Sequence, residues 1–354
     1  MIASPLRGPV ARSVLPTERL AAMKVILHVG AHRCATTTFQ HYMRRQSSAL
    51  RQGGVGFWGP GRTRTGLFSG IQPRVVRLSR HQPARRAAGR LRLNMTRSAQ
   101  KGIDTLVVSD ENMLGSMFAN AEAACLYPAA GERLARYGNA FGQTVSDVIL
   151  SVRAQDRYWA SLLGYLAAKG YGPWPQEQLQ EIVDSHRSWR DVLMDIACAV
   201  PNARVHVAPF EIFASRPDAL LRAVVPGSAT PRSGLSEKRN ATPKAAALRI
   251  LANEQLAPQL PDELRRWSPF SKAACAALKE AYADDIQWLR GGADGLARLV
   301  SDPDKTQPDK APDHTNATRG NGDDRKENRM AATRRNRIAR QASRDPYLEN
   351  ARRY

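Results

Sequence analysis

The sequence predicts an α/β protein in which a parallel sheet lies between two layers of helices. Short apolar runs alternate with amphipathic stretches along the chain, as repeated strand-helix units require. The runs are nearly continuous in their apolar character, which is typical of strands buried on both faces. Residues 24–45, KVILHVGAHRCATTTFQHYMRR, show one such unit directly, because an apolar strand ends at Gly30 and a helix follows. We therefore expect a three-layer fold.

The first half of the chain supplies three long strands, one short strand and the helices that connect them. Apolar spacing and Gly or Pro breaks set the limits of each element. In order, the expected elements are strand 24–30, helix 35–52, strand 55–59, a polar loop, a basic helical stretch around 71–101, strand 105–111, helix 131–141 and strand 147–153.

The second half continues the same alternation and ends in helices. The Gly/Pro segment KGYGPWP separates two helices, and a loop rich in Ser, Gly and Pro precedes the last two. In order, we expect helix 156–169, helix 176–200, strand 204–213, the short helix RPDALLRAVV, and helices near 243–257 and 271–290.

Length and composition favour one large domain with two tails. A chain of 354 residues with 42% hydrophobic content can bury a sizeable core, which we place at 23–300. Residues 1–22 read either as a disordered leader or as a segment before a true start at Met23. Residues 301–354 contain few large apolar side chains, so we expect a disordered basic tail.

The cysteines and the hydropathy pattern indicate a cytoplasmic protein. The cysteines lie far apart without paired spacing, which argues against a disulfide framework and a zinc site. No apolar run reaches the roughly 18 residues that span a bilayer, and the N-terminal segment lacks the apolar core of a secretory signal. The four cysteines are Cys34, Cys125, Cys198 and Cys275.

Positive charge is concentrated in one part of this basic chain. The formal net charge is +21, and seventeen Lys and Arg residues lie between Glu18 and Asp104 without one acidic residue. Such a block attracts polyanions, although a solvated helix face in an Arg-rich protein explains it equally well. Aromatic residues that stack on bases are scarce here, so we expect no specific nucleic acid. An anionic substrate remains: a sugar polymer, a nucleotide or an acidic lipid head group at a membrane surface.

The turn after the first strand has features that predict an anion-binding site. A strand-to-helix turn directs unsatisfied N–H groups and the positive end of the helix dipole outward, where phosphate commonly binds. Arg33 adds a full charge and a planar set of donors there. The simpler alternative is that Thr36 or Thr37 caps the helix and Gly30 only permits a tight turn.

This turn does not match the common nucleotide-binding motifs. The triphosphate-binding pattern G-x-x-x-x-G-K-[ST], counted from Gly30, has Ala35 at its second glycine and Thr36 at its lysine. The sequence GAHRCA also lacks the second glycine of the dinucleotide fingerprint. A kinase that resembles P-loop enzymes is therefore a weaker alternative.

A second anion site is indicated by SVRAQDRYWASLLGY. Arg153 lies at the end of its strand, and Ser161 follows eight residues later within the next helix. An arginine and a hydroxyl that converge on one face suit a phosphate on a different edge of a nucleotide. Two phosphate sites imply a bisphosphorylated ligand.

These residues resemble the sulfotransferases that use 3′-phosphoadenosine 5′-phosphosulfate, especially bacterial members. In that family the first strand ends in a basic residue and small or hydroxyl residues that hold the 5′-phosphosulfate. A strand-end Arg and a Ser eight residues on hold the 3′-phosphate, as Arg153 and Ser161 would. The family's usual loop lysine is Arg33 here, which keeps the charge and alters the donor geometry. The matching loop is His32, Arg33, Cys34, Ala35, Thr36, Thr37 and Thr38.

The resemblance covers roughly residues 23–290 and implies a P-loop-like architecture with 3′-phosphoadenosine 5′-phosphosulfate as co-substrate and no metal. It implies that backbone amides from Cys34 to Thr38 and the hydroxyls of Thr36 and Thr37 hold the 5′-phosphate. Arg33 would bridge the sulfate and the leaving oxygen. Lys238 and Arg239, in SEKRN, match a basic phosphate-binding loop, although a solvated turn is an equal alternative.

Candidates for the general base follow the strand at 105–111. Family members use a His or a carboxylate near the mouth of the site, and SDENM offers Asp110 and Glu111 at the carboxyl edge of the sheet. We prefer Glu111 for its longer reach, and Asp110 is equally suited to cap the following turn. His32 is a third candidate, whereas His28 fits a core position.

We therefore expect transfer of a sulfuryl group to a hydroxyl acceptor, by family analogy a carbohydrate or lipid-linked sugar, such as an anionic glycan or glycolipid. The alternative class is a non-catalytic α/β protein that binds a polyanion with its basic surface. The binding protein would lose affinity when the 62–101 arginines are changed, and the enzyme when Arg33 is changed.

Overall fold

The computed structural model describes residue 20 and residues 22–73, 82–227, 230–232, 244–260 and 266–305. All the described helices and strands belong to one compact unit. Most of the expected leader and most of the expected tail lie outside the described residues.

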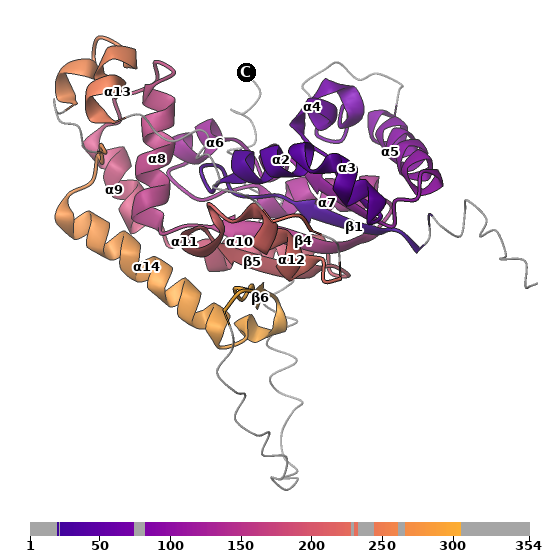
Figure 1. Ribbon diagram of the computed structural model, residues 1–354. Coiled ribbons are helices and arrows are strands. Elements are labelled where there is room, and N and C mark those ends of the chain that lie inside the picture. Colours follow the sequence, from indigo (N-terminus) through magenta and orange to yellow (C-terminus); the bar gives the residue numbers. More distant parts are fainter. Residues whose placement is uncertain are drawn as a thin grey trace, which may run out of the picture. The chain divides into compact units, whose positions relative to one another are not determined.

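The sheet has six parallel strands in the order β2-β3-β1-β4-β5-β6 (Figure 1). β1 lies between β3 and β4, with His28 opposite Ser109 on one side and Ile149 on the other. The predicted parallel α/β fold is thus confirmed. The strands are β1 (Lys24–His28), β2 (Val55–Trp58), β3 (Thr105–Ser109), β4 (Val145–Val152), β5 (Arg204–Pro209) and β6 (Arg298–Leu299).

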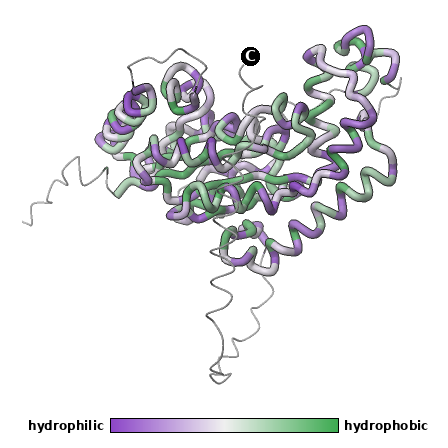
Figure 2. The backbone as a smooth tube through the Cα atoms, turned by 180° about the vertical axis from the view of Figure 1, so that it is seen from behind, coloured by the Kyte–Doolittle hydropathy of each residue, from purple (hydrophilic) through white to green (hydrophobic). Residues whose placement is uncertain are grey.

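Helices pack on both faces of the sheet, because alternate strand residues enter two separate cores. Leu106 and Val108 of β3 join one core, whereas Val107 between them joins the other. Hydrophobic residues accordingly mark the strands in Figure 2. The helices of the first core include α5 (Pro83–Gln100), α7 (Ala130–Ala140), α8 (Gln155–Ala167), α9 (Gln176–Asp184), α10 (Trp189–Ala199) and α14 (Lys272–Arg290); those of the second include α2 (Thr36–Arg45), α3 (Ser47–Gln52), α11 (Phe210–Phe213) and α12 (Pro217–Val224).

Shorter elements complete the described unit. They are α4 (Pro60–Arg62), the π-helical turn η1 (Thr63–Leu67), α6 (Met117–Glu122), α13 (Ala245–Leu251) and the 3₁₀ turns η2 (Glu111–Met113), η3 (Ala257–Gln259) and η4 (Ala293–Gly295). Sequence periodicity missed α4, η1, α6 and the two-residue strand β6, because elements this short contain too few residues to show a period.

Several expected elements were too long, and three of them show the reason. The helix at 35–52 divides at Gln46, and the helix at 176–200 divides where Ser188 begins α10 with a reciprocal capping box. The strand at 204–213 ends at Pro209, and the next four residues form α11 instead. In each case a local cap or turn overrides a continuous hydrophobic pattern.

Residues 301–305, at the start of the expected tail, are held against α12 by ion pairs. Arg216 donates to Asp302, and Arg222 donates to Asp304 at 2.8 Å. Within the described residues, no helix combines the length and hydrophobicity needed to cross a membrane.

Candidate functional site

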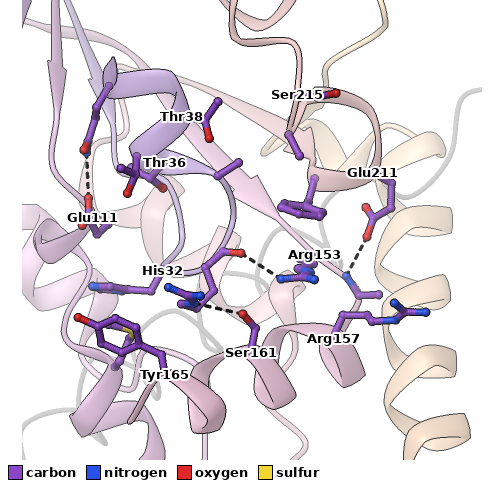
Figure 3. A pocket seen from close by; sticks show the side chains of 18 of the residues that line it. His32, Thr36, Thr38, Glu111, Arg153, Arg157, Ser161, Tyr165, Glu211 and Ser215 are labelled. Atoms are coloured by element: carbon purple, nitrogen blue, oxygen red, sulfur yellow. Dashed lines mark hydrogen bonds between the residues drawn. The ribbon is translucent and has the colours of Figure 1, made fainter. Parts of the chain in front are cut away.

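A pocket lies where strand order changes direction around β1. The loops after β1, β3, β4 and β5 all contribute to it, and it encloses about 960 Å³ (Figure 3). Ligands of open α/β sheets bind in this position, beyond the carboxyl ends of the strands. The volume is that of a pocket for a nucleotide-sized ligand.

The loop between β1 and α2 takes an unusual path along one side of the pocket. Gly30, Arg33 and Ala35 all have positive φ, at 58°, 64° and 64°. The Thr36 hydroxyl donates to the Ala31 carbonyl at 3.2 Å and closes the loop. A Cβ on Gly30 would lie 2.4 Å from the Thr36 Oγ1, so the turn requires glycine there.

Gly30→Ala should therefore lower the melting temperature and weaken anion binding. A left-handed conformation costs an alanine about 1–2 kcal/mol, and the contact with Thr36 adds to this. Gly142→Ala is a matched control, because Gly142 has a similar φ of +66° and a Cβ added there would meet no atom within 4 Å. Thermal unfolding of both variants checks this, and equal losses would contradict the role of the Thr36 contact.

The N-terminus of α2 faces the pocket without a side-chain cap. Its N-cap is Ala35, which makes no side-chain capping hydrogen bond, and the first turn has no acidic residue. The alternative that Thr36 or Thr37 caps the helix is therefore wrong. Thr36, Thr37 and Thr38 line the pocket. The amide of Cys34 donates to the Ala31 carbonyl at 3.2 Å, so this amide belongs to the loop and not to the first turn of the helix.

Arg33 reaches from this loop to α8. Its Nε donates to the Ser161 hydroxyl at 3.1 Å, and its guanidinium carbon lies 5.0 Å from the centre of the Tyr165 ring. Burial lowers the pKa of Arg33, and the nearby charge of Arg153 lowers it further. Two guanidinium groups thus approach one another at the pocket wall.

Arg153 completes the convergence of the two predicted anion sites. Its Nη1 donates to the Arg33 carbonyl at 3.2 Å, its guanidinium carbon lies 4.2 Å from the centre of the Phe210 ring, and its own carbonyl accepts from Trp189 at 2.8 Å. Burial lowers its pKa as well. The structure therefore brings Arg33, Arg153 and Ser161 together in one pocket.

Positive charge exceeds negative charge among the lining side chains, with seven Arg or Lys residues against three Asp or Glu residues. Sequence analysis missed Arg157, which lies on the pocket wall between Arg153 and Ser161 at helical spacing. Its position four residues after Arg153 and four before Ser161 could have indicated that it lies on the same side of the helix as they do. Arg157 and Lys279 approach one oxygen of Asp156 at 3.7 and 3.9 Å, which is too long for hydrogen bonds. Both cations can thus turn toward an anion.

His32 is held by hydrogen bonds on both ring nitrogens. Its Nε2 lies 3.1 Å from the Asn112 Oδ1, which only accepts, so Nε2 carries the proton. Its Nδ1 then accepts from the Tyr127 hydroxyl at 2.8 Å, and that hydroxyl also accepts from the His32 amide. Burial lowers its pKa. The ring is neutral with its lone pair engaged, which disfavours it as a general base.

The two carboxylates after β3 have different surroundings. Asp110 is buried, caps η2 through the Asn112 amide and accepts from Thr63 at 2.6 Å and Arg64 at 2.7 Å. It therefore has the capping role that the sequence left open. Glu111 lines the pocket instead.

Glu111 is oriented by two donors. Arg64 donates to one carboxylate oxygen and Gln40 to the other, both at 2.9 Å. Burial alone would raise the pKa of Glu111, but the charge of Arg64 outweighs it, so the net pKa lies below its ordinary value. Gln40 also donates to Ser109, whose hydroxyl contacts the buried His28. Sequence analysis missed Gln40, which carried no motif.

The remaining predicted residues have little part in the described pocket. Cys34 is buried, and burial raises the pKa of its thiol to about 12, so the thiol stays protonated. Lys238 and Arg239 lie outside the described residues. In the part of the chain that the structure describes, no group of three or more His, Cys, Asp or Glu side chains is placed to hold a metal ion.

Comparison with known proteins adds no relative. No protein-family model, no curated protein and no solved structure matches the chain.

Proposed function

We propose that the protein transfers a sulfuryl group from 3′-phosphoadenosine 5′-phosphosulfate to a hydroxyl acceptor. The observation that carries the proposal is the convergence of Arg33, Arg153 and Ser161 beside the uncapped N-terminus of α2. The buried Arg153, the half-buried Arg33 and a helix N-terminus in one pocket favour a ligand with more than one anionic group.

The pocket fits this co-substrate in charge and construction. The β1-α2 loop and helix N-terminus form a P-loop-like phosphate site, and cationic side chains line the pocket on the α8 and α14 sides. A triphosphate would lack the loop lysine that ordinarily contacts it, since Thr36 occupies that position. The bisphosphorylated nucleotide is therefore favoured over ATP.

Each part of the co-substrate has residues to hold it. The amides and hydroxyls of Thr36, Thr37 and Thr38 would bind the 5′-phosphate, and Arg33 would stabilise charge on the leaving oxygen. Arg153 and Ser161 would bind the 3′-phosphate. Arg33, Arg153 and Ser161 are already held by contacts with one another and with the rings of Tyr165 and Phe210, and such electrostatic preorganisation lowers a barrier.

Glu111 is the proposed general base. Its carboxylate faces the pocket, stays ionised because its pKa is lowered, and is held by Gln40 and Arg64. It would take the proton of the acceptor hydroxyl as the new O–S bond forms and the S–O bond to the 5′-phosphate breaks. Asp110 and His32 hold the neighbouring loops through their own hydrogen bonds.

Label transfer tests this proposal. The protein is incubated with ³⁵S-labelled 3′-phosphoadenosine 5′-phosphosulfate and a panel of neutral and acidic glycans and glycolipids, beside γ-³²P-labelled ATP with magnesium. We expect ³⁵S in at least one acceptor and a rate about 100-fold lower in Arg33→Ala, because a half-buried charged donor is lost. Phosphoryl transfer from ATP without sulfuryl transfer would contradict the proposal.

A further inference from the structure

The pocket extends beyond the proposed donor site to the surroundings of Glu111. Figure 3 shows Glu111 and Arg157 on opposite sides of the pocket. The wall on the Glu111 side includes Gln40 and Arg44 of α2 and Arg64 of η1. No phosphate contact is assigned to any of these side chains, so this end of the pocket is free for the acceptor.

Arg44 is distinguished from Arg64 by its charge partners. Arg64 pairs with both Asp110 and Glu111. None of the ion pairs found among the described residues involves Arg44. The Arg44 side chain is exposed, and its Nε donates to the Gln40 carbonyl one helical turn earlier, at 3.3 Å. Its positive charge is therefore available to a ligand in the pocket.

A simpler role for Arg44 is to offset the dipole at the end of its helix. Arg44 and Arg45 both lie in the last turn of α2 and are both exposed, so either serves that role. Of the two, Arg44 lines the pocket and Arg45 does not. Successive helical residues are about 100° apart, which places Arg45 on a different side of α2. The dipole thus explains a cation at either position, but not the position of Arg44 in the pocket wall.

Helix α2 sets the distances along this wall. Its first residue, Thr36, marks the proposed 5′-phosphate site. At a rise of about 1.5 Å per residue, Gln40 lies about 6 Å and Arg44 about 12 Å farther along the helix axis. The sulfuryl group is bonded directly to the 5′-phosphate, so it can approach Gln40 and Glu111, whereas Arg44 is one turn farther away. An anion at Arg44 would therefore belong to the acceptor and not to the donor.

We propose that Arg44 binds an anionic substituent of the acceptor, and that the acceptor is an acidic sugar with a carboxylate or a sulfate ester. A planar guanidinium can donate two parallel hydrogen bonds to such a group. Gln40, which orients the proposed base, and Arg44 are one turn apart, so the reacting hydroxyl and the anion can belong to a single sugar ring. That this sugar is the acceptor rests on the proposed sulfuryl transfer.

Three matched monosaccharides test this anion site. Methyl β-glucuronide carries a carboxylate, methyl β-glucoside carries no charge, and methyl β-glucoside 6-sulfate carries a sulfate ester on the same ring. Their binding to the full chain is measured by ligand-observed NMR titration. Arg44→Gln should bind at least one charged sugar about tenfold more weakly than the wild type, because a hydrogen-bonded ion pair is lost. The sugar that loses more affinity identifies the preferred anion.

Arg45→Gln is the matched control, because it removes the same charge from the same helical turn. It should bind all three sugars as the wild type does, and the glucoside should bind equally to all three proteins. Arg33 and Arg153 also attract anions, so the affinity that Arg44→Gln removes is the measure of this site. Unchanged binding of both charged sugars in Arg44→Gln, an equal loss in Arg45→Gln, or no binding of either charged sugar to the wild type would overturn the inference.

A second titration separates this inference from the proposed function. Adenosine 3′,5′-bisphosphate should bind with the same affinity to the wild type, Arg44→Gln and Arg45→Gln, because both arginines lie outside the donor site. Binding of a charged sugar that depends on Arg44, without any bisphosphate binding, would refute the donor site alone. Bisphosphate binding without an Arg44-dependent sugar would refute the acidic-sugar site alone.

Discussion

Arg153→Ala should weaken binding of adenosine 3′,5′-bisphosphate by about 100-fold or more while changing the affinity for adenosine 5′-monophosphate much less. The proposed 3′-phosphate contact involves a buried guanidinium, and loss of such a charged partner costs about 2–5 kcal/mol. Arg153 is 7% exposed, and its position is fixed by Phe210 and the Arg33 carbonyl. Calorimetric titration of both nucleotides into both proteins isolates the contact.

Arg190→Ala is the matched control for this cycle. Arg190 also lies over an aromatic ring, at 4.9 Å from the centre of Trp288, but it is outside the pocket. We expect wild-type affinity for both nucleotides. An equal loss of both nucleotides in Arg153→Ala would show that Arg153 does not distinguish the 3′-phosphate.

Glu111→Gln should lower turnover in the label-transfer assay by about 100-fold or more, because the amide cannot accept the hydroxyl proton. Affinity for adenosine 3′,5′-bisphosphate should change little, since no phosphate contact is assigned to Glu111. Glu132→Gln is the control, because Glu132 also pairs with an arginine, Arg136, but lies outside the pocket. Unchanged turnover in Glu111→Gln would remove it from the mechanism.

The pH dependence of the wild type provides a second check on Glu111. Its pKa is lowered in the folded protein, so the carboxylate stays ionised as pH falls from 8 toward 5. Its contribution to kcat/KM should be constant over that range and be lost only below the ordinary glutamate pKa of about 4.3. A loss of rate with an apparent pKa near 6.5 that persists in Glu111→Gln would indicate histidine instead.

The fold class could be predicted from the sequence because buried strands are composed almost entirely of apolar residues. β3, with five buried residues, and β4, with mostly buried ones, read as continuous apolar runs, and such runs occur in parallel sheets covered on both faces. The full strand order could not be predicted, since the two-residue strand β6 is too short to show a hydrophobic pattern.

Site residues could be predicted where a single chain segment contains both the functional side chain and the strand or helix that positions it. Arg33 follows a strand within a few residues, and Arg153 with Ser161 spans one strand end and one helix face. Residues whose surroundings come from distant segments could not be assigned. Asp110 and Glu111 are neighbours in sequence. Asp110 has a structural role because Thr63 and Arg64, from a distant segment, donate hydrogen bonds to it.

His32 shows the same limit most clearly. The base assignment depended on whether its nitrogens are free, and the groups that engage them, Tyr127 and Asn112, lie 95 and 80 residues away. A local sequence pattern cannot predict contacts between residues this far apart along the chain.

Calorimetric binding of adenosine 3′,5′-bisphosphate without metal, beside ATP with magnesium, tests the central claim most directly. The wild type should bind the bisphosphate more tightly than magnesium-ATP, and both Arg33→Ala and Arg153→Ala should lose that binding. Preference for magnesium-ATP, or no bisphosphate binding by the wild type, would contradict the sulfotransferase proposal.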